Sequence, residues 1–206
     1  MLENELIAAP DRDSRRLMVV LHGLGDSLEG YRWVPEALGL PSLNYLLVNA
    51  PAPYYGGYSW YDFAGDIAPG VARSRTLVFE LLDQYRARGF PPEAMIVSGF
   101  SQGCLMSMEV GLRYGHRLAG IVGISGYVCE PEKALKEVSP VALAQRFLVT
   151  HGTEDPLIPI SVARQHFGLL KTAGVRIEWH EFAKGHTIAG ERELAVIRNF
   201  IREMLP

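Results

Sequence analysis

The chain has 206 residues, of which 48% are hydrophobic and 21% charged, and its formal net charge is −3. This is an ordinary globular composition, and the length predicts one domain, residues 1–206, around one substantial core. No basic stretch suggests a nucleic-acid partner, and no run approaches the roughly 20 apolar residues that span a bilayer, so stable membrane insertion is not expected.

Two cysteines, Cys104 and Cys129, stand far apart in the sequence and lack the paired spacing of a zinc site. We expect both to be buried, reduced thiols, as in cytoplasmic proteins. The segment after Met1 carries acidic residues where a signal peptide needs basic ones, and no apolar run follows it. The sequence therefore predicts a soluble, cytoplasmic protein without a cysteine zinc site.

Short apolar runs alternate with longer segments of helical periodicity. Strands are predicted at residues 17–21, 43–48, 94–98, 118–124, 147–150 and 175–181. Helices are predicted at residues 27–38, 72–88, 102–114, 160–173 and 189–204. Most of the strand segments are continuously apolar, as in strands buried on both faces, so the alternation predicts an α/β protein with a mostly parallel central sheet and helices on both faces.

Two segments lie outside this regular pattern. Residues 5–9 are expected to add an antiparallel strand at one edge of the sheet. Residues 49–70 are rich in Pro, Gly, Tyr and Trp and form an unusually long connection. Connections of this length are often functional.

The strand at residues 94–98 leads into Gly99-Phe100-Ser101-Gln102-Gly103, a G-x-S-x-G motif followed by a predicted helix. In α/β hydrolases a sharp strand-to-helix turn of this kind presents a nucleophilic serine at the edge of the sheet. Larger side chains two residues before and after the serine would collide, which explains the two glycines. The alternative is that these glycines only permit close packing of the helix on the sheet.

The first main strand runs into His22-Gly23-Leu24-Gly25-Asp26. Ester hydrolysis passes through a charged oxygen that fixed N–H donors must stabilise. In this fold one donor is the residue after the nucleophile, here Gln102, and the other comes from the loop after an early strand. The Leu24 amide is the second candidate, and the His22 side chain is expected to be structural.

The serine also needs a base, which in this fold is a histidine that follows both the serine and an acid in the chain. The six histidines are His22, His116, His151, His166, His180 and His186. His22 precedes the serine, and four others fall within or at the end of predicted helices or strands. His186 lies in the loop after the last strand, where its imidazole can reach Ser101.

The acid is expected in the loop after the preceding strand, where Glu154 and Asp155 are neighbours. Pro156 biases Asp155 toward an extended backbone, which favours Asp155 over Glu154 as the partner of His186. Either acid could instead be an ordinary solvated turn residue.

Four ordered motifs resemble the phospholipase/carboxylesterase family, which includes the acyl-protein thioesterases. They are His22–Asp26, Gly99–Gly103, His151–Asp155 with Pro159, and Gly185-His186. The resemblance extends from about residue 17 to the end of the chain. It implies a small α/β-hydrolase fold with little or no lid, no cofactor, the same Ser101–Asp155–His186 triad, and activity on esters or thioesters with apolar acyl groups.

The chain also departs from the pattern of this family. Cys104 stands where the family often has another glycine, and residues 53–65 are unusually aromatic. Within that segment Tyr58 and Trp60 are two residues apart and are candidates for lining an acyl pocket, since such residues point the same way in an extended chain. The alternative is that these aromatic rings pack the loop onto the domain.

The sequence therefore predicts a serine hydrolase whose substrate is a small-molecule or lipid-like ester or thioester. Carboxylesterase, lysophospholipase and acyl-protein thioesterase activities all fit this chemistry. The rival hypothesis from another class is a non-catalytic small-molecule receptor on the same fold, because a fold alone does not fix function.

Overall fold

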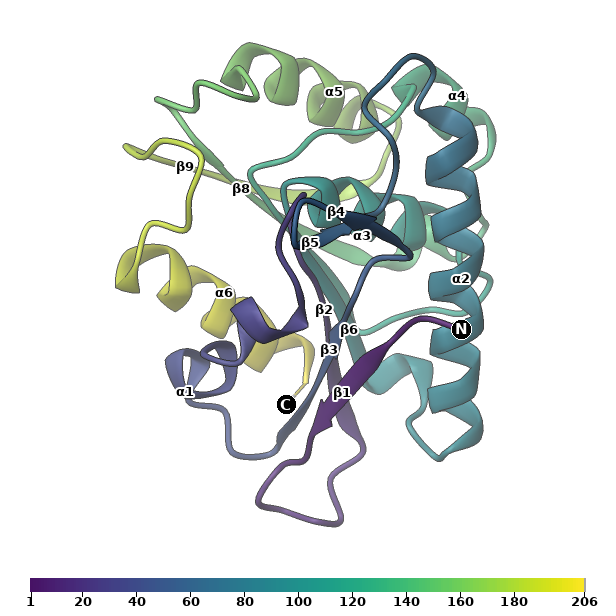
Figure 1. Cartoon of the computed structure of the whole chain (residues 1–206), viewed down its shortest axis with the longest axis vertical. Helices are drawn as coiled ribbons and strands as arrows, with labels where there is room; N and C mark the ends of the chain where they lie inside the picture. The colour runs from purple at the N-terminus through teal and green to yellow at the C-terminus, as the bar shows by residue number, and fades with distance from the viewer. Residues whose placement is uncertain (206) are drawn as a thin grey trace.

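A computed structural model describes residues 1–205, and a seven-stranded sheet forms its centre (Figure 1). The strand order is β1-β3-β2-β6-β7-β8-β9, and every neighbouring pair is parallel except β1 with β3. The strands are β1 (Asn4–Ile7), β2 (Arg16–Leu21), β3 (Leu43–Val48), β6 (Met95–Phe100), β7 (Gly120–Ile124), β8 (Arg146–Gly152) and β9 (Arg176–Phe182). The predicted mostly parallel sheet is confirmed.

Helices cover both faces of this sheet, as predicted (Figure 1). One face carries α1 (Val34–Leu38) and α6 (Glu191–Met204). The other carries α2 (Ala68–Ala87), α3 (Gln102–Arg113), α4 (Pro131–Lys136) and α5 (Ile160–Thr172). The helices therefore form a buried apolar layer on each side of the strands.

Strand β2 shows why continuously apolar segments form the centre of this sheet. Its Leu17, Val19 and Leu21 pack on the side of α2 and α3, whereas Met18 and Val20 pack on the side of α1 and α6. Successive side chains of a strand point to opposite faces, so a strand covered on both sides must be apolar at every position.

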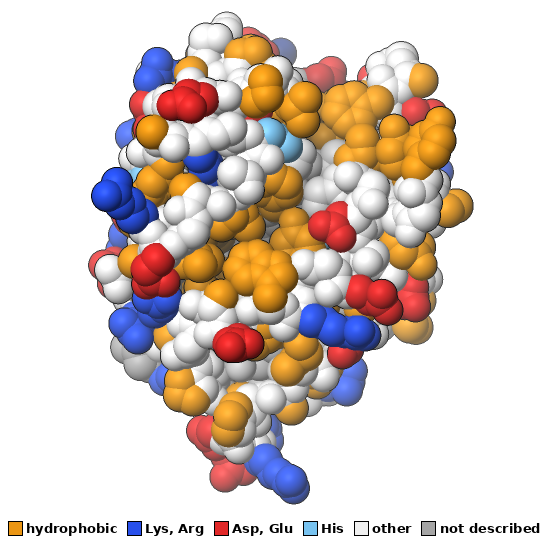
Figure 2. Space-filling view, turned by 60° about the vertical axis from the view of Figure 1, so that its left-hand side comes forward, with side chains coloured by type: hydrophobic (Ala, Val, Ile, Leu, Met, Phe, Trp, Pro, Cys, Tyr) orange, Lys and Arg blue, Asp and Glu red, His pale blue; other side chains and the backbone are white. Residues whose placement is uncertain are grey.

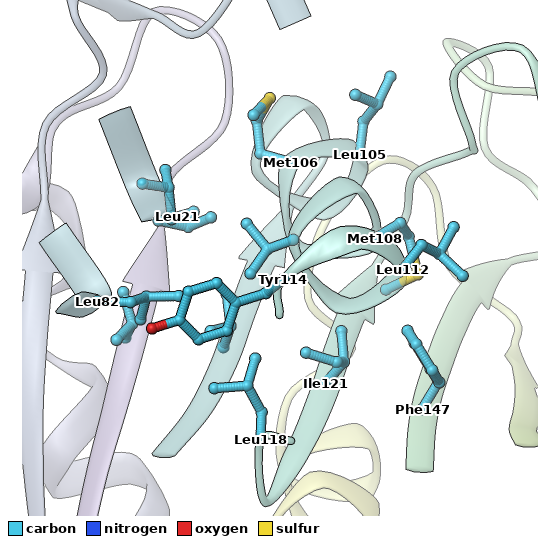
Figure 3. Packing of buried hydrophobic residues seen from close by; sticks show 14 of the residues in the cluster. Leu21, Leu82, Leu105, Met106, Met108, Leu112, Tyr114, Leu118, Ile121 and Phe147 are labelled. Carbon is cyan, nitrogen blue, oxygen red and sulfur yellow. The ribbon is translucent and has the colours of Figure 1, made fainter. Parts of the chain in front are cut away.

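Helix α3, which begins directly after Ser101, is the most deeply buried helix of the site. Every residue from Gln102 to Leu112 is buried. Figure 3 shows its Leu105, Met108 and Leu112 packed among side chains that include Phe147 of β8. Because its neighbours enclose this helix on all sides, its first turn has a fixed position.

Three segments differ from the sequence-based expectation. Residues 27–38 form two short elements, the 3₁₀ turn Leu28–Tyr31 and then α1, because Pro35 lacks an N–H and suits the first turn of a new helix. Helix α2 begins at Ala68, four residues before the expected start. Helix α4 was not predicted.

The N-terminal edge strand and the long aromatic loop are also resolved. The antiparallel edge strand is confirmed as β1, although it spans Asn4–Ile7 rather than residues 5–9. The loop at residues 49–70 contains a hairpin, β4 (Ala52–Tyr54) and β5 (Gly57–Ser59). None of the helices within residues 1–205 has the length and apolar composition that crossing a bilayer requires.

Replacing Gly103 by alanine tests the close contact between α3 and β2. A Cβ on Gly103 would lie 2.0 Å from the Leu21 carbonyl oxygen, so Gly103→Ala should lower the free energy of unfolding by about 1–3 kcal/mol. Gly168 on α5 is the matched control, since a Cβ there meets nothing within 4 Å and alanine should stabilise the helix by up to about 1 kcal/mol. Urea unfolding measures both, and equal stability of Gly103→Ala and the wild type would contradict the contact.

Candidate active site

Ser101 occupies the turn between β6 and α3 with an unusual backbone conformation, φ 55° and ψ −114°. Non-glycine residues rarely adopt a positive φ, and it persists only where the surroundings enforce it. The Ser101 N–H donates to the Ile124 carbonyl at 2.9 Å, and a Cβ on Gly99 would lie 2.0 Å from the Gly103 carbonyl oxygen. The turn is therefore held on both sides and exposes the hydroxyl at the carboxyl end of the sheet.

The structure brings Ser101, His186 and Asp155 into one hydrogen-bonded line. The Ser101 hydroxyl lies 2.8 Å from His186 Nε2, and His186 Nδ1 lies 2.7 Å from Asp155 Oδ2. A carboxylate only accepts hydrogen bonds, so Nδ1 carries the proton and Nε2 is free to accept the serine proton. This is the geometry of a serine activated by a base that an acid orients.

Asp155 is fixed as a carboxylate by its own loop. Its side chain is buried, and Oδ1 accepts N–H bonds from Leu157 and Ile158, both at 2.9 Å. Burial alone would raise the pKa of Asp155, but these bonds and that of His186 hold it below its ordinary value. Glu154, the alternative acid, is exposed and uses its backbone N–H to bond the Lys184 carbonyl.

Two further histidines close to the site have structural roles. His22 is buried; its Nε2 accepts the Ala50 N–H at 3.0 Å, and burial lowers its pKa. His151 donates from Nε2 to the Ile158 carbonyl at 3.0 Å and stacks on Trp179, which shapes the loop that carries Asp155. The expected structural role of His22 agrees with these contacts.

The hairpin β4–β5 positions the loop that contains Leu24. The Gly25 N–H donates to the Tyr58 carbonyl and the Tyr58 N–H donates to the Asp26 carbonyl, both at 2.9 Å. A Cβ on Gly57 would lie 2.2 Å from the Gly25 carbonyl oxygen, so the hairpin touches the loop directly. Tyr58 therefore supports the site through its backbone.

Gln102 joins α3 to the same aromatic segment. Its side-chain Oε1 accepts the backbone N–H of Trp60 at 2.9 Å, and its Nε2 donates to the backbone carbonyl of Tyr61 at 3.0 Å. The backbone N–H of Gln102 is the first of the helix, and the first N–H groups of a helix have no acceptor within it. That N–H therefore stays available at the serine.

The expected pocket role of the Tyr58 and Trp60 side chains is not met by the structure. Trp60 is completely buried and its indole N–H donates to the His22 carbonyl at 2.9 Å. The Tyr58 hydroxyl instead reaches Glu3 of the N-terminal segment at 3.3 Å. Neither residue lines the cavity beside Ser101: the Trp60 ring belongs to the buried core, and the Tyr58 ring packs against that core.

A cavity of about 610 Å³ opens beside Ser101 and His186. Much of its wall is apolar, and the residues that form this wall are Leu24, Phe63, Phe100, Leu157, Ile158 and Val162. Phe63 belongs to the aromatic segment at residues 53–65. Leu157 and Ile158 follow Asp155 in the same loop, after Pro156, and this nearness in sequence was the signal that could have identified them. Residues 1–205 contain no group of three His, Cys, Asp or Glu side chains that could hold a metal ion.

A buried ion pair that was not predicted closes the loop that carries His186. Lys184 Nζ donates to both carboxylate oxygens of Glu193, at 2.6 and 2.8 Å, and Glu193 also accepts the Ala189 N–H. Both charged side chains are almost wholly buried. Burial lowers the pKa of Lys184, and the carboxylate of Glu193 opposes that shift. Glu193 thus joins the two flanks of the His186 loop.

Comparisons with known proteins agree on one family. A family model described as Phospholipase/Carboxylesterase matches residues 2–205. Acyl-protein thioesterase 1 of Schizosaccharomyces pombe is 33% identical over 169 residues, which cover 76% of this chain and 75% of that protein. Acyl-protein thioesterase 1 of Debaryomyces hansenii is 27% identical over 221 residues, covering 97% and 95%. The crystal structure of esterase PE8 superposes with a TM-score of 0.85 at 28% identity, covering 99% of each chain.

Removing the cation of the buried pair should destabilise the fold. Lys184→Met leaves the Glu193 carboxylate without its partner and should lower the free energy of unfolding by about 3–5 kcal/mol. The double variant Lys184→Met, Glu193→Met removes both charges and should recover most of that loss. Thermal unfolding compares the two, and a single variant as stable as the wild type would rule out a stabilising pair.

Proposed function

Because the chain belongs to the phospholipase/carboxylesterase family, we propose that its serine-hydrolase reaction takes place at Ser101 and acts on esters or thioesters of apolar acyl groups. Its α/β-hydrolase fold and its hydrolase class agree with the sequence-based expectation. The observation that carries the proposal is the unbroken line from Ser101 through His186 to Asp155 at the edge of an apolar cavity.

In the proposed mechanism, His186 Nε2 takes the hydroxyl proton as Ser101 Oγ attacks the acyl carbon. Asp155 remains ionised and stabilises the imidazolium. The Leu24 and Gln102 N–H groups stabilise the oxyanion. The bond to the leaving oxygen or sulfur then breaks, and that atom takes the proton from His186. Water, deprotonated by His186, releases the acid from the acyl-enzyme.

In this proposal the acyl group occupies the cavity beside Ser101. An acyl chain bonded to Ser101 extends naturally between Phe63 and the wall formed by Leu157, Ile158 and Val162, since these side chains line the same cavity as the serine. Burial of each methylene there contributes about 0.8 kcal/mol. We therefore include lipid-like as well as small esters and thioesters in the proposed substrate class, as the acyl-protein thioesterase relatives suggest.

The proposal extends to domain organisation and location. Residues 1–206 form one domain, supported by a single large sheet with strands from Asn4 to Phe182. The protein works in the cytoplasm, supported by Cys104 and Cys129, which are free and buried as suits a reducing compartment.

Ser101→Ala should abolish both labelling and turnover. A fluorophosphonate should add one adduct to the wild type, detected by mass, and none to the variant, while hydrolysis of a thioester should fall by about 10⁵-fold. Ser161→Ala, on the exposed start of α5, is the control and should behave as the wild type. Unlabelled wild-type protein that binds esters without cleaving them would favour the receptor hypothesis.

Val162→Phe should shorten the acyl cavity, because Val162 lines it from the first turn of α5. The kcat/KM for a long-chain ester should fall by about tenfold or more, within the range that pocket contacts provide, while that for the acetate ester changes little. The acetate ester serves as the internal control for folding and for the catalytic groups. Equal losses on both substrates would place the acyl chain elsewhere.

A further inference from the structure

A second hollow of about 450 Å³ meets the acyl cavity at the catalytic histidine. Asp26, Phe100 and His186 line both, but Ser101 and Leu24 line only the first. The second hollow extends toward the loop after His186 and toward the 3₁₀ turn that precedes α1, with Tyr31, Trp33, Thr187, Ile188 and Leu194 among its lining residues.

The chemistry of the reaction gives the two hollows different occupants. The acyl group becomes bonded to Ser101 and so remains in the hollow that contains this residue. The leaving atom has to come within hydrogen-bond reach of His186 Nε2 to take its proton. We propose that the second hollow binds the leaving group, and that it favours a cationic leaving group over an anionic one. This inference rests on the proposed function.

The charges that line the second hollow support this preference. Asp26 places a carboxylate there, and the lining residues found within residues 1–205 include no lysine or arginine. The nearest basic residue in sequence, Arg32, is paired with Glu5 at 2.8 Å. Arg198 of α6 is likewise paired, with Glu191 at 2.9 Å.

An aromatic surface lines the same hollow as this carboxylate. Trp33 lines the hollow and is 41% exposed. Its ring stacks on the ring of the buried Tyr31, with 6.5 Å between the ring centroids. In Figure 2, hydrophobic side chains surround a hollow near a histidine, and both acidic and basic side chains lie on the same face. A carboxylate together with an accessible indole attracts an ammonium group by charge and by cation–π interaction.

Three thioesters that share a butyryl group test the proposal. Their leaving groups are thiocholine, which is cationic, 2-mercaptoethanol, which is neutral, and mercaptoacetate, which is anionic. At low ionic strength the wild-type kcat/KM should fall by about fivefold at each step from cation to neutral to anion. Thiol release measured with a thiol-reactive dye gives all three values.

Two variants separate the contributions of the hollow. Asp26→Asn should lower the cation-to-anion ratio of kcat/KM severalfold relative to the wild type, and Trp33→Leu should lower the cation-to-neutral ratio. Asp13→Asn changes the net charge equally at an exposed position outside the hollow and should leave both ratios unchanged.

The outcomes distinguish this inference from the proposed function. If the wild-type protein hydrolyses none of the three thioesters, the proposed function itself is rejected. Hydrolysis of all three at equal kcat/KM would overturn only the leaving-group assignment, as would ratios that stay at the wild-type value in both Asp26→Asn and Trp33→Leu. Because ratios within one variant are compared, a partial loss of folding does not obscure the result.

Discussion

The strained backbone at Ser101 is the constraint on which the rest of the site depends. Ser101 has a φ of 55°, and a serine keeps such a backbone conformation only if the surrounding structure prevents it from adopting another. Here the β6–α3 turn has room for backbone atoms but not for a Cβ at Gly99 or Gly103. The enclosure of α3 on all sides fixes its first turn, so the serine hydroxyl and the Gln102 N–H hold their positions before substrate binds.

Asp155 and His186 lie on loops that are far apart in the chain, and a backbone hydrogen bond holds these loops together. The backbone N–H of Glu154, in the loop that carries Asp155, donates to the carbonyl of Lys184, in the loop that carries His186, at 3.1 Å. The Lys184–Glu193 pair then closes the loop around His186. On the other side of the serine, the hairpin β4–β5 holds the Leu24 loop, and Gln102 holds the segment that follows the hairpin. Preorganisation of this kind lowers the cost of stabilising charge when it develops.

The sequence supported the fold and the catalytic geometry better than it supported the pocket. The parallel strands were predictable because strands buried on both faces must be apolar at every position, and the meeting of Ser101, His186 and Asp155 followed from chain order. The pocket was not predictable in the same way. An aromatic residue such as Trp60 suits both the wall of a cavity and the packing of a loop, so its type does not distinguish the two roles. The hydrogen bond from its indole N–H to the His22 carbonyl, which holds the ring in the core, is seen only in the folded structure. The pairing of Lys184 with Glu193 likewise depends on how α6 docks.

The structure of a covalent phosphonate adduct would test the central claim most directly. If the Ser101 turn is preorganised as a nucleophile with its oxyanion donors, the phosphorus is bonded to Ser101 Oγ. One phosphonyl oxygen then lies about 2.7–3.1 Å from both the Leu24 and Gln102 nitrogens, with the Ser101 backbone unchanged. An adduct whose oxygen faces solvent, or a turn that relaxes to a negative φ when it forms, would contradict the account.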